Sequence, residues 1–228
     1  MTTRITHNWN LSPKEAIQLQ QELKTKVKIE PLTKPIQYIA GADISFNRGE
    51  DTVYVGIVVL KYPELIEVDR VLLIGEATFP YIPGLLSFRE SPLLIKAWEK
   101  LRIKPDVIVA DGHGIAHIRR FGIACHLGLL TDTATIGCAK KIFVGTHGIL
   151  EEEKGSIAQI CYKEETVGVV LRTRKNVKPV YISAGHKITL EQAIEVMNTC
   201  TSNYRIPVPT RQAHLIVNEL RRGELEVE

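Results

Sequence analysis

Three carboxylates of this chain stand beside apolar or conformationally restricted segments. Asp43 lies within Gly41-Ala42-Asp43-Ile44-Ser45, Asp111 directly follows the apolar run at 107–110, and Glu90 follows a loop rich in proline and glycine. Burying a lone carboxylate costs on the order of several kcal/mol, so three that converge need a compensating cation. Mg²⁺ prefers oxygen ligands and retains waters beside a phosphate substrate. These residues therefore indicate metal-assisted chemistry on a phosphate.

Two further side chains could assist such chemistry. Lys140 follows an apolar segment and could offset charge on a phosphate, with Lys141 as a second candidate. His214 lies off the apolar face of the last expected helix. Simpler roles exist for each residue: Glu90 could complement a helix dipole, Asp43 could face water at a strand end, and Lys140 and His214 could lie on the surface.

Two loops suggest how a flat ligand could be held. Pro80-Tyr81-Ile82-Pro83-Gly84 places an aromatic and an aliphatic side chain between two stiffening prolines, as in a wedge that enters a base stack, although an ordinary turn is the alternative. Gly112-His113-Gly114 allows close approach to the backbone. The pattern G-x-G-x-x-G fails at His117, and Asp111 would repel a pyrophosphate, which argues against a dinucleotide-dependent oxidoreductase.

The elements that must position these residues follow from periodicity. Ser12-Pro13-Lys14-Glu15 predicts a helix from there to about residue 26, and helical spacing recurs at 88–101 and 115–127. A capping box at Thr189 and the prolines at 207 and 209 predict two closing helices. Strands are expected at 38–45, 52–60, 68–79, 107–110, 134–139, 155–162, 167–172 and 179–183.

This order predicts an α/β fold. Short turns join the first three strands, which favours an antiparallel meander, and the later alternation of strands and helices predicts a mixed central sheet with helices on both faces. We expect residues 1–228 to form a single domain, with a peripheral N-terminal helical segment at 1–30 and a frayed acidic tail at 223–228.

Composition narrows the class of protein. A net charge of +3 permits nucleic-acid binding without arguing for it. The four cysteines form no Cys-x-x-Cys pair, and the histidines at 113, 117, 126 and 147 match no zinc spacing. The first 30 residues contain no apolar signal region and no stretch approaches a membrane span, so we expect a cytoplasmic protein without membrane contact.

These motifs together resemble the endonuclease V family, the deoxyinosine 3′ endonucleases, which have a ribonuclease H-like fold. The resemblance runs from about Leu11 to Arg222 through the Asp43 strand and four motifs. The motifs are residues 80–90, Asp111-Gly112-His113-Gly114 with 119–122, residues 136–140, and residues 205–214. The block from Pro80 to Glu90 is highly specific. The chain departs at His113, where glutamine is expected in many relatives, and at Cys138, where valine is expected.

The resemblance implies a site. Asp43 and Asp111 would bind Mg²⁺, with Mn²⁺ as a substitute, and Glu90 would bind through water or hold a second ion. Lys140 and His214 would complete the catalytic set by offsetting phosphate charge and orienting water. The flipped lesion would enter a backbone-lined pocket while Tyr81 fills the vacated space. The substrate-binding residues so implied are Pro80, Tyr81, Ile82, Pro83, Gly84, Leu86, Gly112, His113, Gly114, His117 and Gly137.

The activity implied by the resemblance is DNA repair. Such an enzyme recognises deaminated bases, chiefly deoxyinosine, and hydrolyses the second phosphodiester bond 3′ to the lesion, leaving a 3′-hydroxyl and a 5′-phosphate. The partner would be inosine-containing DNA or RNA, and the protein is expected to be a monomer. An inosine-specific ribonuclease and a non-catalytic reader of damaged nucleic acid are the alternatives.

Overall fold

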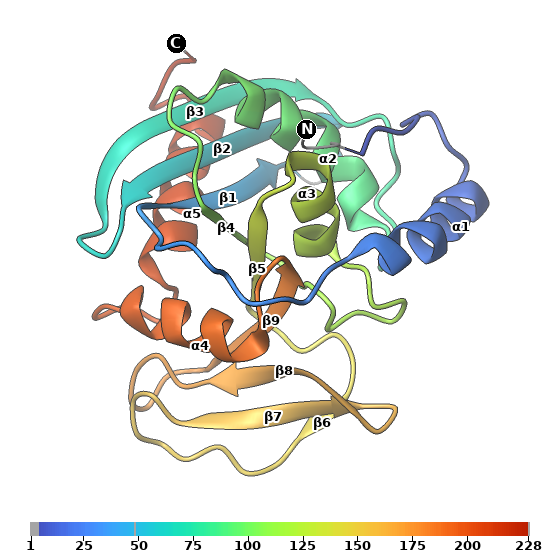
Figure 1. Ribbon diagram of the computed structural model, residues 1–228. Coiled ribbons are helices and arrows are strands. Elements are labelled where there is room, and N and C mark those ends of the chain that lie inside the picture. The colour runs from blue at the N-terminus through green and yellow to red at the C-terminus, as the bar shows by residue number, and fades with distance from the viewer. Residues whose placement is uncertain (1–4, 48, 228) are drawn as a thin grey trace.

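The structure is a computed structural model that describes residues 5–47 and 49–227. Within those residues nine strands form one sheet in the order β3-β2-β1-β4-β5-β9-β8-β7-β6 (Figure 1). The strands are β1 (Tyr38–Phe46), β2 (Thr52–Lys61), β3 (Ile66–Glu76), β4 (Val107–Ala110), β5 (Ala134–Ala139), β6 (Thr146–His147), β7 (Ile157–Tyr162), β8 (Glu165–Leu171) and β9 (Val180–His186). The helices are α1 (Pro13–Leu23), α2 (Leu86–Lys100), α3 (Ile123–Thr131), α4 (Leu190–Thr199) and α5 (Val208–Arg221), with a 3₁₀ turn at Lys24–Lys26.

Strand pairing confirms the predicted mixed sheet. β1, β2 and β3 form the antiparallel meander, whereas β1, β4 and β5 run parallel. β9 returns antiparallel to β5, and β8, β7 and β6 continue beyond it as an antiparallel extension. Because β4 and β5 are parallel, Asp111 and Lys140 emerge at the same edge of the sheet.

Helices cover the two faces of the sheet, as the alternation of its side chains requires. On one face Ile39, Val58 and Val109 pack with residues of α4 and α5. On the other face Ala42, Ile57 and Ile108 pack with α2 and α3. Figure 1 shows α5 behind β1 and β2 and α2 on the opposite side of the sheet, while α3 lies beside β5. The site residues must therefore reach the sheet edge from two layers.

The helix predicted at 115–127 is wrong. Residues 115–122 form an irregular loop, and α3 begins only at Ile123. The backbone N–H of Ile115 donates to the Ala184 carbonyl of β9 instead of forming a helical turn. Arg120 adopts a positive φ of 58°, which ordinary helical backbone does not contain. Bonding to a neighbouring strand has overridden the helical spacing of this segment.

The capping box predicted at Thr189 is half formed. The Thr189 side chain accepts from the backbone N–H of Gln192 as expected. The Gln192 amide does not reach back to Thr189, because it pairs with both backbone groups of Leu32, 2.8 and 3.2 Å away. The residue that would close the cap instead fixes the segment before β1.

The first helix begins as predicted. The capping box at Ser12 is complete, and no helix in the described part of the chain is long and apolar enough to cross a membrane. The single domain stays a prediction. Residues 1–4 of the predicted peripheral segment and Glu228 of the predicted tail lie outside the described residues.

Gly41 sets how closely α5 approaches β1. A Cβ atom at Gly41 would lie 1.9 Å from the Pro209 carbonyl oxygen at the start of α5. Gly41→Ala should therefore force the two elements apart and lower the unfolding free energy by about 1–3 kcal/mol, as overpacking does. Urea denaturation measures this loss.

Gly148→Ala is the matched control, because nothing lies within 4 Å of the added methyl group there. Its unfolding free energy should change by no more than about 0.5 kcal/mol. Equal midpoints for the two variants would contradict the tight contact between α5 and β1.

Candidate active site

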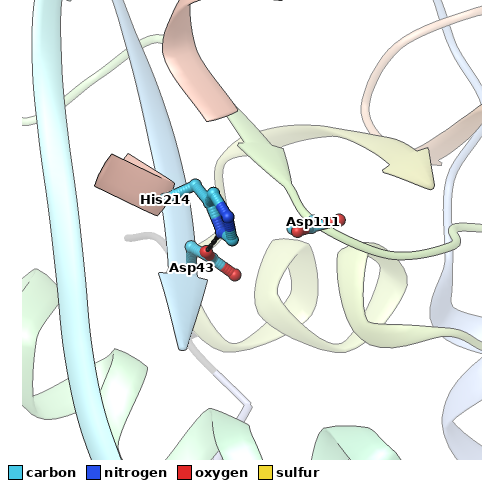
Figure 2. Close-up of side chains that lie close together, drawn as sticks. All are labelled: Asp43, Asp111 and His214. Carbon is cyan, nitrogen blue, oxygen red and sulfur yellow. Dashed lines mark hydrogen bonds and ion pairs between the residues drawn. The ribbon is translucent and has the colours of Figure 1, made fainter. Parts of the chain in front are cut away.

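Asp43, Asp111 and His214 converge at the sheet edge (Figure 2). One ligand atom from each lies within 4.8 Å of the others. Asp43 is on the same face of β1 as Ile39 and Gly41, which is the face that α5 covers, so it meets His214 of that helix. The structure therefore assembles three side chains that could hold a metal ion, here called the metal-binding cluster, from β1, the end of β4 and α5.

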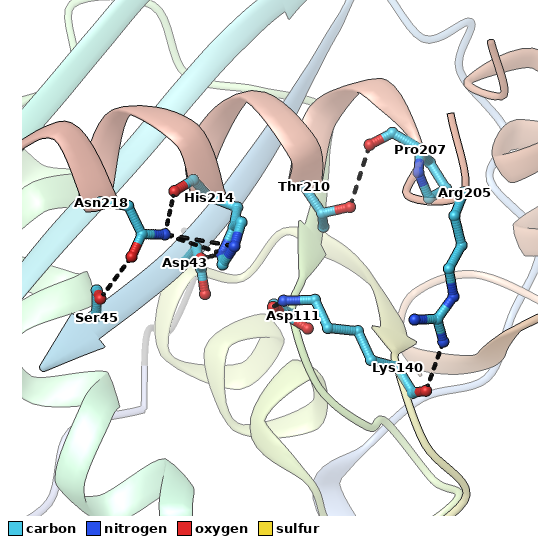
Figure 3. Close-up of polar contacts among 9 residues, drawn as sticks. All are labelled: Asp43, Ser45, Asp111, Lys140, Arg205, Pro207, Thr210, His214 and Asn218. Atoms are coloured by element: carbon cyan, nitrogen blue, oxygen red, sulfur yellow. Dashed lines mark hydrogen bonds and ion pairs between the residues drawn. The ribbon is translucent and has the colours of Figure 1, made fainter. Parts of the chain in front are cut away.

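His214 is held in a defined orientation. Its Nδ1 lies 2.8 Å from Oδ2 of Asp43. Because a carboxylate only accepts, Nδ1 carries the proton in this contact, and the tautomer with its proton on Nδ1 alone has a lone pair on Nε2, 3.4 Å from the Asn218 amide nitrogen. The Asn218 amide donates to the His214 carbonyl at 2.6 Å, and the Ser45 hydroxyl donates to Asn218 at 3.1 Å (Figure 3). The ring can thus offer Nε2 to a metal or a water.

Lys140 forms an ion pair with Asp111 (Figure 3). Both side chains remain partly exposed, at 35% and 16%. Arg205 donates to the backbone carbonyl of Lys140 at 2.7 Å, which fixes the chain where β5 ends. The ammonium group is thereby placed beside the carboxylates, where a phosphate would also approach.

Glu90 of α2 interacts electrostatically with the aspartates of this cluster. Burial, followed by the negative charges of Asp43 and Asp111, raises the pKa of Glu90 well above its ordinary value. Burial and then Asp43 also raise the pKa of Asp111, an effect that Lys140 partly offsets. The three carboxylates thus form an under-compensated negative site in the protein alone.

This donor set fits a hard divalent cation. Two carboxylates and one imidazole lie close enough to share an ion, and the third carboxylate is electrostatically coupled to them. Oxygen-rich sets of this kind suit Mg²⁺ or Mn²⁺, while the single lysine neutralises only part of the charge.

A cavity of about 190 Å³ adjoins the carboxylates. Its wall includes Gly112, the neighbour of Asp111, so the cavity and the metal-binding cluster are separated by one backbone step. The lining residues are Gln20, Tyr81, Ile82, Pro83, Gly84, Leu86, Ser87, Gly112, His113, His117, Phe121, Gly122, Ile123 and Phe143. Apolar and aromatic walls suit a flat ring.

Buried hydrogen bonds hold residues 80–84, here called the wedge loop, beside the cavity. Gln20 of α1 is only 1% exposed and donates to the carbonyls of Gly84 and Phe121, at 3.0 and 3.1 Å. Arg119 also donates to the Gly84 carbonyl, at 2.7 Å. Two donors thus already occupy this carbonyl, which leaves it a poor acceptor for a ligand.

Two histidines of the cavity are neutral. Burial lowers the pKa of His113 to about 4. Burial, followed by the positive charge of Arg119, lowers the pKa of His117 to about 4. The His113 ring stacks near Phe143 with centroids 5.9 Å apart, and its Nε2 lies 3.1 Å from the Lys141 carbonyl. An uncharged wall is appropriate for an uncharged base.

Comparison with known proteins decides the family. The endonuclease V family model matches residues 21–215. The chain belongs to the endonuclease V family. Endonuclease V of Myxococcus xanthus is 47% identical over 219 residues, which cover 96% of this chain and 93% of that protein.

Two solved endonuclease V structures share the fold. That of Streptomyces avermitilis superposes with a TM-score of 0.89 at 37% identity, covering 98% of this chain and 99% of the other. That of Ciona intestinalis, in complex with a 24mer DNA containing an inosine followed by a ribo-adenosine, has a TM-score of 0.81 at 28% identity, with 93% and 98% covered.

The structure brings the sequence-predicted endonuclease V residues together in two adjoining groups. Asp43, Asp111 and His214 converge at the sheet edge, Lys140 forms an ion pair with Asp111, and the charges of Asp43 and Asp111 act on Glu90. Eight of the predicted substrate-binding residues line the cavity, namely Tyr81, Ile82, Pro83, Gly84, Leu86, Gly112, His113 and His117.

Pro80, Gly114 and Gly137 do not line the cavity. The two glycines instead allow backbone segments to pack closely. A Cβ atom at Gly114 would lie 2.0 Å from the Ala184 carbonyl oxygen, and one at Gly137 would lie 2.4 Å from the Gly114 nitrogen. These two contacts pack the 112–114 turn closely against β9 and β5.

Several lining residues were missed by sequence reasoning. Gln20 lies on α1, which the sequence indicated to be peripheral, and Phe143 lies 32 residues beyond Asp111 along the chain. Phe121, Gly122 and Ile123 were assigned to the interior of the wrongly predicted helix. Locating that helix start at Gly122 would have placed these three at the cavity, whereas Gln20 and Phe143 carry no sequence signal for it.

The raised pKa of Glu90 predicts how the metal-free protein responds to pH. As pH rises past the ordinary carboxyl pKa, the unfolded chain releases its proton while folded Glu90 retains one, so folding stability falls until the raised pKa is passed. Glu90→Gln should flatten this fall. Melting temperature against pH measures it, at about 2–4 °C for each kcal/mol.

Addition of Mg²⁺ or Mn²⁺ should restore the stability of the wild type at neutral pH, because an ion that binds only the folded state stabilises it. Glu195→Gln, the same change at an exposed position of α4, is the control. Parallel melting curves for wild type and Glu90→Gln across this pH range would contradict the coupling of Glu90 to the cluster.

Proposed function

We propose that this protein is a Mg²⁺-dependent endonuclease that recognises deaminated bases in DNA, chiefly deoxyinosine. It hydrolyses the second phosphodiester bond 3′ to the lesion and leaves a 3′-hydroxyl and a 5′-phosphate. The main support is the adjacency of Asp111 in the metal-binding cluster and Gly112 in the cavity wall. A base held in that cavity has its own backbone beside the carboxylates. The inosine-containing DNA bound by the Ciona intestinalis relative agrees with this choice.

Each catalytic residue has a role that its position supports. Asp43 and Asp111 would hold the metal, which when bound supplies an activated water and offsets negative charge. Glu90 would act through a water or hold a second ion. Lys140 would neutralise charge on the scissile phosphate, and Nε2 of His214 would orient a water nearby.

Selection of the base would depend on backbone donors. Hypoxanthine presents a carbonyl acceptor where adenine presents an amino donor, so a fixed N–H group favours hypoxanthine by roughly 1–3 kcal/mol. The Gly84 carbonyl, already engaged by Gln20 and Arg119, offers little to the amino group of adenine. The occupied Gly84 carbonyl and a free backbone N–H group would therefore both favour hypoxanthine over adenine.

Removing a metal ligand tests the catalytic assignment. Asp43→Ala or Asp111→Ala should abolish cleavage of inosine-containing DNA while binding survives, because the metal acts mainly on the transition state. Single-turnover cleavage and equilibrium binding measure the two effects separately. Glu195→Gln on α4 again serves as the control.

Activity within about tenfold of wild type, which is roughly 1.4 kcal/mol, in either aspartate variant would contradict the metal assignment. Wild-type protein that binds inosine-containing DNA but does not cut it with Mg²⁺ would instead favour a non-catalytic reader. Inosine-containing RNA assayed alongside the DNA distinguishes the ribonuclease alternative.

The wedge can be tested through Tyr81. Its side chain is 61% exposed, and its ring is near that of Phe46, with the two centroids 6.3 Å apart. Because most of the ring is exposed, it is accessible to the bases of a bound duplex. Tyr81→Ala should weaken the preference for inosine-containing over undamaged duplex by about 1–3 kcal/mol, the range measured for base–aromatic stacking. Affinity for the two duplexes gives this ratio.

Tyr81→Phe retains the ring and should keep the preference. An unchanged ratio in Tyr81→Ala would show that the ring is an ordinary surface side chain.

A further inference from the structure

An aromatic–cationic pair lies on the surface beside the metal-binding cluster. The Arg211 guanidinium lies over the Tyr204 ring, with its central carbon 3.7 Å from the ring centroid. Tyr204 is 52% exposed. Among the described residues, none forms a hydrogen bond or ion pair with the Arg211 guanidinium. The pair thus combines one open ring with an arginine whose donors are available.

The pair is fixed in position relative to the metal-binding cluster. Arg211 precedes His214 by three residues on α5, so the two lie on the same side of the helix one turn apart. Arg205, the neighbour of Tyr204, donates to the carbonyl of Lys140 (Figure 3). It also donates to the carbonyls of Lys178 and Pro179. The Thr173 hydroxyl donates to the Arg205 carbonyl at 2.6 Å. The loop that carries Tyr204 is therefore tied to the same backbone that places Lys140.

The pair and the cavity lie on opposite sides of the carboxylates. Leu86 and Ile123 in the cavity wall belong to α2 and α3, which cover one face of the sheet. Arg211 belongs to α5, which covers the other face. A strand whose lesion base enters the cavity and whose phosphate reaches Asp43 and Asp111 must cross the sheet edge between these layers. It then emerges on the α5 side, at Arg211 and Tyr204.

We propose that Tyr204 and Arg211 form a binding site for the nucleic-acid strand on the 3′ side of the cut. The inference rests on the proposed function, which places the cut 3′ to the flipped base and so makes the emerging segment the 3′ flank. A base of that flank stacks on the open face of Tyr204. Arg211 donates to the adjacent phosphate and holds the ring in place from its other face. The site binds the strand and takes no part in bond cleavage.

The experiment varies the 3′ flank and the pair together. Single-stranded DNA with one deoxyinosine is prepared with a long 3′ flank or with a flank that stops one nucleotide past the expected cut, with the 5′ flank constant. Single-turnover cleavage in Mg²⁺ across enzyme concentrations gives a half-saturating concentration and a rate at saturation. Wild type, Tyr204→Ala, Arg211→Ala and Tyr204→Phe are compared, and circular dichroism confirms folding.

On the long substrate, Tyr204→Ala and Arg211→Ala should each raise the half-saturating concentration about fivefold or more, while the rate at saturation stays within about twofold. On the short substrate both should match wild type, and Tyr204→Phe should match it on both. Lys100→Ala, which removes one positive charge from the last turn of α2, controls for net charge. A loss in Lys100→Ala equal to that in Arg211→Ala would overturn the inference, because long-range charge alone would explain it.

Equal losses on long and short substrates, or no loss on either, would overturn the inference while leaving the proposed function intact. Arg211→Ala keeps the test decisive if Tyr204→Ala does not fold, because Arg211 makes no other polar side-chain contact among the described residues. Wild type that cuts inosine-free strands equally well would count against the proposed function itself.

Discussion

The mutual repulsion of carboxylates at one sheet edge is the constraint on which the site depends. Asp43, Asp111 and Glu90 come from β1, the end of β4 and α2. Burial, followed by the charges of the neighbouring carboxylates, raises the pKa of Glu90 and of Asp111. Folding that brings such groups together is unfavourable unless something else stabilises the surrounding layers. The buried apolar clusters on both faces of the sheet provide that stabilisation. The negative site is therefore imposed by the fold and remains available to a cation, with Lys140 offsetting only part of it.

Close backbone approach is the second requirement, and glycines meet it where helices and turns press on the sheet. Because Gly41 has no side chain, the start of α5 packs directly on β1, and His214 of this helix contacts Asp43. Gly137 and Gly114 let the 112–114 turn rest on β5 and β9, which sets Gly112 against the cavity and Asp111 against the metal-binding cluster. Larger side chains at these positions would move ligands that must agree to within fractions of an ångström.

Sequence reasoning predicted the sheet and the acidic cluster because both depend on local signals. Apolar segments rich in β-branched residues indicated β1, β4 and β5, and an aspartate within or directly after such a segment is uncommon. It failed at residues 115–122, where helical spacing was overridden by a hydrogen bond from Ile115 to β9 that no local pattern encodes. Gln20 and Phe143 join the cavity through packing between segments far apart in sequence. The membership of the family follows from the motifs, whereas the pocket wall follows from tertiary contacts.

The two faces of the sheet also divide the work of recognition. The α2 and α3 side supplies an uncharged cavity whose histidines are neutral and whose Gly84 carbonyl is already occupied. The α5 side supplies polar groups, among them the exposed His214 and the positively charged Arg211. A neutral base gains little from charge, and a phosphate gains little from an apolar wall, so separating the two environments lets each bind one part of a nucleotide strand. The sheet edge, where the carboxylates lie, is the place at which both parts of the strand can be held at once.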